Sequence, residues 1–199
     1  MFSRRQLVLA AATLACRRKR ATGFPGYALV ATPPARSVAA VNLSTFSLAR
    51  QIPLPAAPGP LLAHPSKPLA WALAPDSGLL CELDLAGLRL ARQLQVARAA
   101  LSMRLAEDAK ILWVLCRDPS QLVAVRLDRL QRVARIPLAA EPLDFDLAHA
   151  LPWAAVAYAS SGAVSFVDLE AARSLPPVAF GRRASLVRFR SDGRLLLAA

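Results

Sequence analysis

Four side chains have the chemical types that do most acid–base work in proteins: His64, His149, Asp144 and Asp146. Paired carboxylates can transfer protons or hold a cation, and histidine can take part in either task. Asp144 and Asp146 are two positions apart, so within a strand both would point to one face. What these residues can do together depends on the elements that position them.

Neither a metal site nor a cofactor is predicted. Two histidines are too few ligands for a zinc site, and no Cys-x-x-Cys or His-x-x-x-His pair lies near them. The chain also contains no glycine-rich phosphate loop, Gly-x-Ser-x-Gly elbow or His-Glu-x-x-His motif. We therefore assign no catalytic residue and expect no bound metal or cofactor.

A 42-residue repeat organises the chain that carries these residues. Its clearest copy begins at Leu83 and reads Leu-Asp-Leu-Ala-Gly-Leu-Arg-Leu-Ala-Arg-Gln-Leu. Similar segments begin at Val41, Val125 and Val167, so each start lies 42 residues after the one before. A constant period of this length indicates a repeat architecture.

Each period contains four short apolar runs separated by turn residues. In the second period the runs cover residues 69–75, 79–85, 90–96 and 102–106, and their length favours strands over helices. Four strands in about 40–45 residues predict the blade of a β-propeller. A sandwich would not repeat at constant spacing, and a helical solenoid would not accommodate 16 prolines. The predicted fold is an all-β propeller of four-stranded blades, about four of which are present.

The motifs of the repeat also resemble a known family. They are Val167-Asp168-Leu169, Ile52-Pro53-Leu54, Ile136-Pro137-Leu138 and Ser191-Asp192-Gly193-Arg194. Over residues 27–199 the pattern resembles the YVTN-type β-propeller repeat of bacterial exported proteins. The aspartate of the motif is replaced by Asn42 in the first copy and by Arg126 in the third. Propellers resembling this one include lactonases and quinone- or haem-linked oxidoreductases, whose chemistry lies at the central channel.

The repeat gives the two histidines nearly equivalent positions. They are 85 residues apart, one more than two periods, which places each in an innermost strand or in the turn after it. Innermost strands line the channel, so His64, His149, Asp144 and Asp146 are the candidate ligand-binding residues at the channel mouth. The simpler alternative is that the histidines are turn residues and the aspartates are solvated charges. Trp71 and Trp113, at identical offsets, are expected to pack between blades.

The first 20 residues indicate export. Arg4 and Arg5 precede an apolar run over residues 7–15, as in a twin-arginine signal, and the run is too short to span a bilayer. Leu-Ala-Cys, ending at Cys16, resembles a lipoprotein cleavage site and would make Cys16 a lipid anchor. The four positive charges at residues 17–20 oppose translocation, and the alternative is a cytoplasmic protein with a basic N-terminus. We expect a linker at 21–26 and propeller from 27 to 199.

Charge does not favour nucleic acid as a partner. The formal net charge is +12, but residues 1–20 supply half of it, and aromatic residues for base stacking make up only 6%. The rest of the charge is spread along the propeller. The expected partner is a protein, a glycan or a small molecule bound at a loop face.

The number of strand copies suggests a fragment. The chain begins on the second strand of one blade and ends on the second strand of another, which leaves a strand surplus to a closed four-blade ring. A ring of about seven blades would need further units. The sequence therefore predicts part of a periplasmic or membrane-anchored propeller acting as a non-catalytic binding scaffold. The alternative is a propeller enzyme whose site lies partly in missing blades.

Overall fold

The structure is a computed structural model that describes residues 24–159, 161–179 and 184–199. Arg4, Arg5 and Cys16 lie outside the described residues, so the export and lipidation predictions remain predictions. Within the described ranges, no helix has the length and hydropathy to cross a bilayer.

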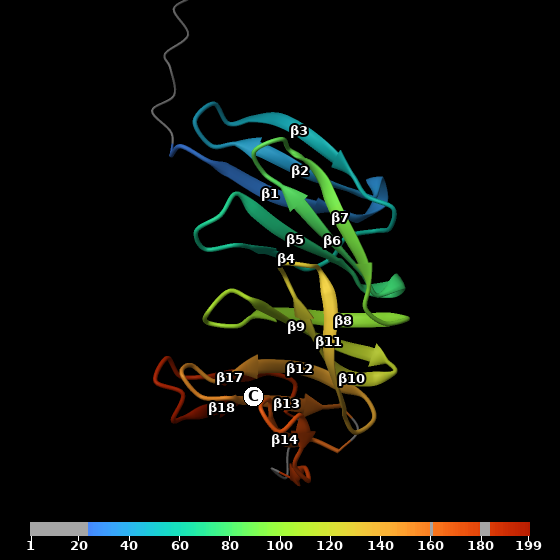
Figure 1. Cartoon of the computed structure of the whole chain (residues 1–199), viewed down its shortest axis with the longest axis vertical. Helices are drawn as coiled ribbons and strands as arrows, with labels where there is room; N and C mark the ends of the chain where they lie inside the picture. The colour runs from blue at the N-terminus through green and yellow to red at the C-terminus, as the bar shows by residue number, and fades with distance from the viewer. Residues whose placement is uncertain (1–23, 160, 180–183) are drawn as a thin grey trace, which may run out of the picture.

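The described chain is all-β apart from two short 3-10 turns, η1 (Pro33–Ala35) and η2 (Pro75–Ser77). Its antiparallel strands form five successive sheets, which Figure 1 shows following one another from the N-terminal to the C-terminal end. The first sheet contains β1 (Tyr27–Thr32), β2 (Ser37–Asn42) and β3 (Ser47–Pro53). The second contains β4 (Leu61–Ala63), β5 (Leu69–Ala74), β6 (Leu79–Asp84) and β7 (Arg89–Gln95).

The third sheet contains β8 (Ala99–Leu105), β9 (Ile111–Asp118), β10 (Ser120–Arg126) and β11 (Gln131–Pro137). The fourth contains β12 (Pro142–Leu147), β13 (Trp153–Tyr158), β14 (Ala163–Asp168), β15 (Arg173–Ser174) and β16 (Val178–Ala179). The last sheet is the pair β17 (Val187–Phe189) and β18 (Leu196–Ala198). This order confirms the predicted succession of strands, including a first sheet that starts at its second strand.

The aspartate of the repeat motif has a structural role in the turn that follows it. Asp84 Oδ1 accepts the backbone N–H groups of Ala86 and Gly87, at 3.0 and 3.2 Å. Asn42 and Asp168 make the same side-chain turn in their own copies. An Asx turn of this kind replaces backbone pairing where the chain reverses. Arg126 offers no acceptor, so the third copy lacks this contact.

The same turns share a second feature that the sequence does not show. In every copy the residue that ends the turn has a positive φ between 46° and 51°; these residues are Phe46, Leu88, Leu130 and Ala172. In the first three copies a register shift interrupts the pairing with the outer strand nearby. The regular spacing of these irregularities confirms that the 42-residue period is structural.

The outermost strand of the fourth sheet departs from the pattern. It is divided into β15 and β16, which pair separately with β14. Pro176 and Pro177 lie between them, and proline has no N–H to donate to a ladder. Of the other outer strands, β3 and β11 each end with a single proline, and β7 contains none. We attribute the break to the second proline.

The core lies between the sheets. Each cluster of buried apolar side chains joins one sheet to the next, and together the four clusters connect all five sheets. Trp71 and Trp113 lie in two of them, which confirms their predicted packing role. Cys81 and Cys116 are free, buried thiols in separate sheets and serve as small core residues. Burial raises the pKa of Cys81 to about 11 and that of Cys116 to about 12.

Candidate functional site

His64 lies in the turn between β4 and β5. Its Nδ1 accepts the backbone N–H groups of Ser66 and Lys67, each at 3.1 Å. Its ring centroid is 5.9 Å from that of Trp71, with the planes tilted by 41°. Because Nδ1 is engaged as an acceptor, only Nε2 is left to meet a ligand. The histidine organises its turn in the same way that Asp84 organises another.

His149 lies in the turn between β12 and β13 and is exposed. The equivalence with His64 predicted from the repeat is therefore correct, and both residues belong to turns rather than to inner strands. They belong to the second and fourth sheets, with the third sheet between them. The structure does not bring the two histidines together into one site.

Asp144 and Asp146 lie on β12 and share contacts with the strands on either side. Asp146 Oδ2 accepts the backbone N–H of Phe189 at 2.9 Å, and Asp144 Oδ2 accepts that of Val187 at 3.1 Å. Arg104 of β8 bonds to both carboxylates, with its Nε 3.3 Å from Asp146 Oδ1.

A second arginine completes this network. Arg188 of β17 pairs with Asp144 from the opposite side to Arg104. Arg104 also places its guanidinium carbon 5.5 Å from the centroid of the Phe145 ring. The two aspartates thus form a ladder of charges across three neighbouring inner strands. β12 is the first strand of its sheet, and the oxygens of both aspartates are engaged in joining sheets.

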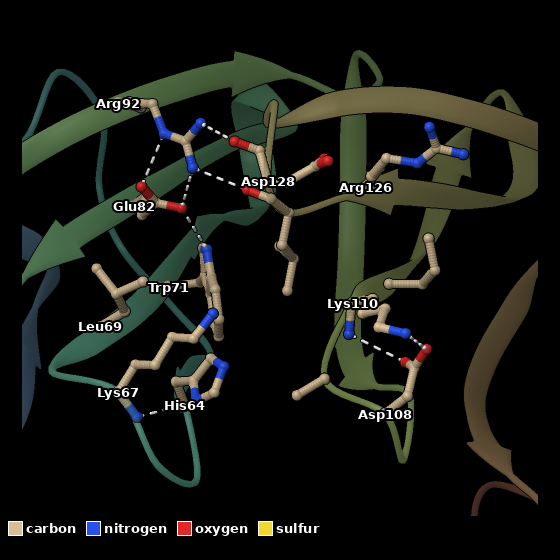
Figure 2. A pocket seen from close by; sticks show the side chains of 13 residues that line it. His64, Lys67, Leu69, Trp71, Glu82, Arg92, Asp108, Lys110, Arg126 and Asp128 are labelled. Carbon is tan, nitrogen blue, oxygen red and sulfur yellow. Dashed lines mark hydrogen bonds and ion pairs between the residues drawn. The ribbon is translucent and has the colours of Figure 1, made fainter.

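A cleft between the second and third sheets, lined in part by His64, offers room for a ligand. Its volume is about 750 Å³, within the range of small-molecule sites. The residues that line it come from both sheets: His64, Lys67, Leu69, Trp71, Glu82, Arg92, Asp108, Ala109, Lys110, Ile111, Arg126, Leu127 and Asp128. Figure 2 shows Trp71 and His64 on the wall of the second sheet, facing Lys110 and Asp108 on the third.

A buried acid anchors the wall of this cleft. Glu82 is only 4% exposed and binds Arg92 through two parallel bonds, Nε to Oε1 and Nη2 to Oε2, both 2.8 Å. The indole N–H of Trp71 donates to Glu82 Oε2 at 3.3 Å. The hydrogen bonds to Glu82, aided by the charges of Glu82 and Asp128, raise the pKa of the Arg92 guanidinium above its ordinary value despite the opposing effect of desolvation. Burying the carboxylate is tolerable because both of its oxygens are paired.

Arg92 also joins the two sheets. Its Nη1 donates to the carbonyl of Asp128 at 2.9 Å, and its Nη2 donates to that of Leu127 at 2.8 Å. Both carbonyls belong to the turn between β10 and β11 of the next sheet. The guanidinium therefore fixes one wall of the cleft to the other, as the dashed lines in Figure 2 show.

Sequence reasoning did not identify this cluster, although the repeat contained a signal. Glu82 and Arg92 are directly paired across β6 and β7. The equivalent pair in the third sheet is Ala124 and Ala134. A charged pair at positions where the next copy has two alanines marks a local specialisation. Aligning the copies residue by residue would have revealed it.

The cations around the cleft are only partly neutralised. Glu82 is paired with Arg92, and Asp108 lies 3.8 Å from Lys110. Within the described ranges, Lys67 and Arg126 form no ion pair, whereas the Asp128 carboxylate accepts the N–H of Arg129. Among the same residues, no three His, Cys, Asp or Glu side chains gather as a metal site would require. The lining carries four cations (Lys67, Arg92, Lys110 and Arg126) and three carboxylates (Glu82, Asp108 and Asp128), so the cleft combines an aromatic wall with a formal net charge of +1.

Comparisons with known proteins identify the fold. No protein-family model and no curated protein sequence matches the chain. Among solved structures, Kuenenia stuttgartiensis hydrazine synthase matches 92% of this chain and 56% of its own, with a TM-score of 0.75 and 14% identity. Dihydro-heme d1 dehydrogenase NirN, in complex with DHE, matches 94% of this chain and 42% of its own, with a TM-score of 0.71 and 19% identity.

These neighbours are β-propeller proteins, and the described chain has the propeller fold that the repeat predicts. The chain spans about half the length of each, 56% and 42%. At 14% and 19% identity, the likeness concerns the fold alone.

Proposed function

We propose that the protein is a non-catalytic binding scaffold of the cell envelope, and that its ligand occupies the cleft between the second and third sheets. The supporting observation is the fixed cleft wall formed by Trp71, Glu82 and Arg92 beside Lys67 and Arg126. A fixed wall loses little conformational entropy when a ligand binds. The aromatic wall and the cations favour a ligand with an apolar body and an anionic group.

The binding proposal can be tested with a matched pair of probes, naphthalene-2-carboxylate and naphthalene-2-carboxamide. We expect saturation-transfer NMR to detect the carboxylate more strongly than the amide, because only the carboxylate can form an ion pair with Lys67 or with Arg126. The double variant Lys67→Ala/Arg126→Ala should remove this preference. Arg50→Ala, at an exposed arginine of β3, is the control. Equal binding of both probes, or a preference that survives the double variant, would contradict the proposal.

The envelope part of the proposal rests on the N-terminal sequence. We infer that Arg4 and Arg5 direct export and that Cys16 becomes a lipid anchor, so the propeller faces the periplasm. Arg4→Lys/Arg5→Lys should leave the protein in the cytoplasm. Cys16→Ser should move it from the membrane fraction to the soluble periplasmic fraction. Unchanged fractionation of both variants would favour the cytoplasmic alternative.

The enzyme alternative is favoured by the names of the two structural neighbours, a synthase and a dehydrogenase. A lactonase-like hydrolase or a quinone- or haem-linked oxidoreductase would place its chemistry at the channel, for which Asp144 and Asp146 are the predicted residues. Hydrolysis of a lactone panel, lost in Asp146→Asn but retained in Glu82→Gln, would support the hydrolase. Both aspartates are engaged by Arg104 and β17, so we favour binding.

A further inference from the structure

His64 closes its turn in the way that Asn or Asp closes other turns of the molecule. Its Nδ1 accepts the backbone N–H groups of the residues two and three positions later, Ser66 and Lys67, each at 3.1 Å. Asn42 and Asp84 accept the corresponding pair of N–H groups through a side-chain oxygen. A short oxygen acceptor is therefore sufficient to close a turn of this kind.

The repeat shows that histidine at this position is peculiar to the second sheet. The equivalent residues in the third and fourth sheets are Ala106 and Ala148. The backbone confirms this equivalence, because the N–H of each of the three residues donates to the carbonyl five positions later, in Leu69, Ile111 and Trp153 respectively. Closing the turn does not require histidine. The second sheet is also the one that carries the buried acid of the cleft wall.

The imidazole of His64 has a second nitrogen that the turn does not use. Because Nδ1 accepts two N–H groups, the proton of the neutral ring lies on Nε2, which makes Nε2 a hydrogen-bond donor. The ring is half-buried and lines the cleft, and Figure 2 shows it next to Trp71, at the space between the two sheets. The tilted contact with Trp71 and the two N–H bonds together hold the ring in place.

We propose that His64 is a specificity-determining residue of the cleft, and that its Nε2–H donates a hydrogen bond to an oxygen of the ligand. This inference rests on the proposed binding function and adds the chemistry of one ligand group to it. A neutral donor selects for an acceptor oxygen of either charge, whereas Lys67 and Arg126 select for negative charge. The ligand class is thereby narrowed to an apolar body that carries an acceptor oxygen, of which a carboxylate oxygen is the stronger kind.

The position of the imidazole proton can be measured without any ligand. His64 and His149 are the only histidines, so the variant His149→Asn leaves a single imidazole signal. Long-range proton–nitrogen NMR of this variant at about pH 8, where an ordinary histidine is neutral, should show the proton on Nε2. A proton on Nδ1 would overturn the inference without affecting the proposed function.

The variant His64→Asn tests the contact with a ligand. Asparagine keeps an acceptor for the turn, as Asn42 does, but its amide nitrogen corresponds to ring carbon Cδ2 and does not extend to the place of Nε2. We expect naphthalene-2-carboxylate and naphthalene-2-carboxamide both to bind about tenfold more weakly, because each offers an acceptor oxygen. The probe 2-methylnaphthalene offers none and should bind equally to both proteins. Saturation-transfer NMR titrations give the dissociation constants, and His149→Asn, outside the cleft lining, is the control.

The outcomes distinguish this inference from the proposed function. Unchanged binding of the two oxygen-bearing probes to His64→Asn would overturn the role of His64. An equal loss for 2-methylnaphthalene would also overturn it, because the ring would then act by stacking. If no probe binds the unsubstituted protein, the proposed function fails and this inference fails with it. The proton measurement does not depend on the folding of His64→Asn, so the inference can be overturned even if that variant is unstable.

Discussion

Two neighbouring interfaces use the same repeat positions in different ways. Between the second and third sheets, Trp71 donates to the buried carboxylate of Glu82, which in turn holds Arg92. Between the third and fourth sheets, Trp113 lies among apolar side chains that include Ala124. The first interface contains the 750 Å³ cleft, whereas a smaller hollow of about 340 Å³ borders Trp113.

The difference shows how a repeat protein can acquire a site without changing its fold. The backbone pairing of Glu82 with Arg92 matches that of Ala124 with Ala134. Only side chains differ, and the charged pair adds bonds to the next sheet that two alanines cannot form. The interface between the third and fourth sheets is apolar at these positions, and the interface between the second and third sheets differs from it by a charged pair.

The largest effect should come from placing a carboxylate in the apolar interface. Ala124→Glu buries a charge without a partner, so we expect a loss of unfolding free energy of about 4 kcal/mol or failure to fold. Adding Ala134→Arg should recover part of that loss by recreating the cross-strand pair. Denaturant unfolding measures both, with Gln131→Glu as an exposed control. A well-tolerated Ala124→Glu would show that the two interfaces are not fundamentally different.

A somewhat smaller loss of unfolding free energy is expected from removing the charged pair between the second and third sheets. Glu82→Ala leaves the Trp71 indole N–H and Arg92 without their acceptor, and should cost about 2–3 kcal/mol. Arg92 is partly exposed, which moderates the cost because water can solvate its guanidinium. A double-mutant cycle with Arg92→Ala measures the coupling of the pair by denaturant unfolding. Additive single effects would mean that the pair does not act as a unit.

A third interface, between the fourth and last sheets, depends on the polar contacts of Asp146. Asp146→Ala removes the acceptor of the Phe189 N–H and one partner of Arg104, so we expect a loss of about 1–2 kcal/mol. Hydrogen exchange at Phe189 should accelerate, whereas exchange in the second sheet should not change. Asp76→Ala, at an exposed aspartate of η2, is the control. Unchanged exchange at Phe189 would show that β17 does not depend on this carboxylate.

The smallest expected change in unfolding free energy concerns the turn after β6 in the second sheet, which Asp84 organises. The backbone N–H of Gly87, followed by that of Ala86 and by the Arg89 charge, lowers the pKa of Asp84 despite the opposing effect of desolvation. A carboxyl with a lowered folded pKa stabilises the protein above its unfolded pKa, near 3.8 here, and this stabilisation fades as the pH falls through the lower folded value.

Asp84→Asn keeps an acceptor for the turn but cannot titrate. We therefore expect the variant to remain folded. Below about pH 4, its unfolding free energy should decrease slightly less steeply with falling pH than that of the unsubstituted protein. Urea unfolding at a series of acidic pH values measures this decline. An unchanged pH profile would mean that Asp84 interacts equally well in both protonation states. Arg126 stands at the equivalent position in the third sheet, so that turn has no carboxylate there.

The sequence contained most of the fold because propeller blades repeat a local pattern. The 42-residue period located the strands to within a few residues. The recurring aspartate marked a turn, since its acceptor serves the two or three residues that follow it. Information of this kind is local, so a single sequence is sufficient to show it.

The candidate binding site was harder to predict from the sequence pattern than the fold. Asp146 bonds to Phe189, 43 residues later, and Arg92 reaches carbonyls of the next sheet. Such contacts depend on how sheets meet, which strand patterns do not specify. His64 and His149 attracted attention as rare chemical types, yet both lie in turns. The Glu82 cluster was overlooked because an isolated acid in a strand resembles any solvated charge.

The layered core has a consequence for cooperativity. Each sheet packs only against the sheets beside it, so stability resembles that of a linear array governed by nearest-neighbour coupling. An end sheet has one neighbour and an inner sheet has two. Among the described residues, the second and third sheets each pack against two neighbours, so the pair that encloses the cleft should open later than a sheet with a single neighbour.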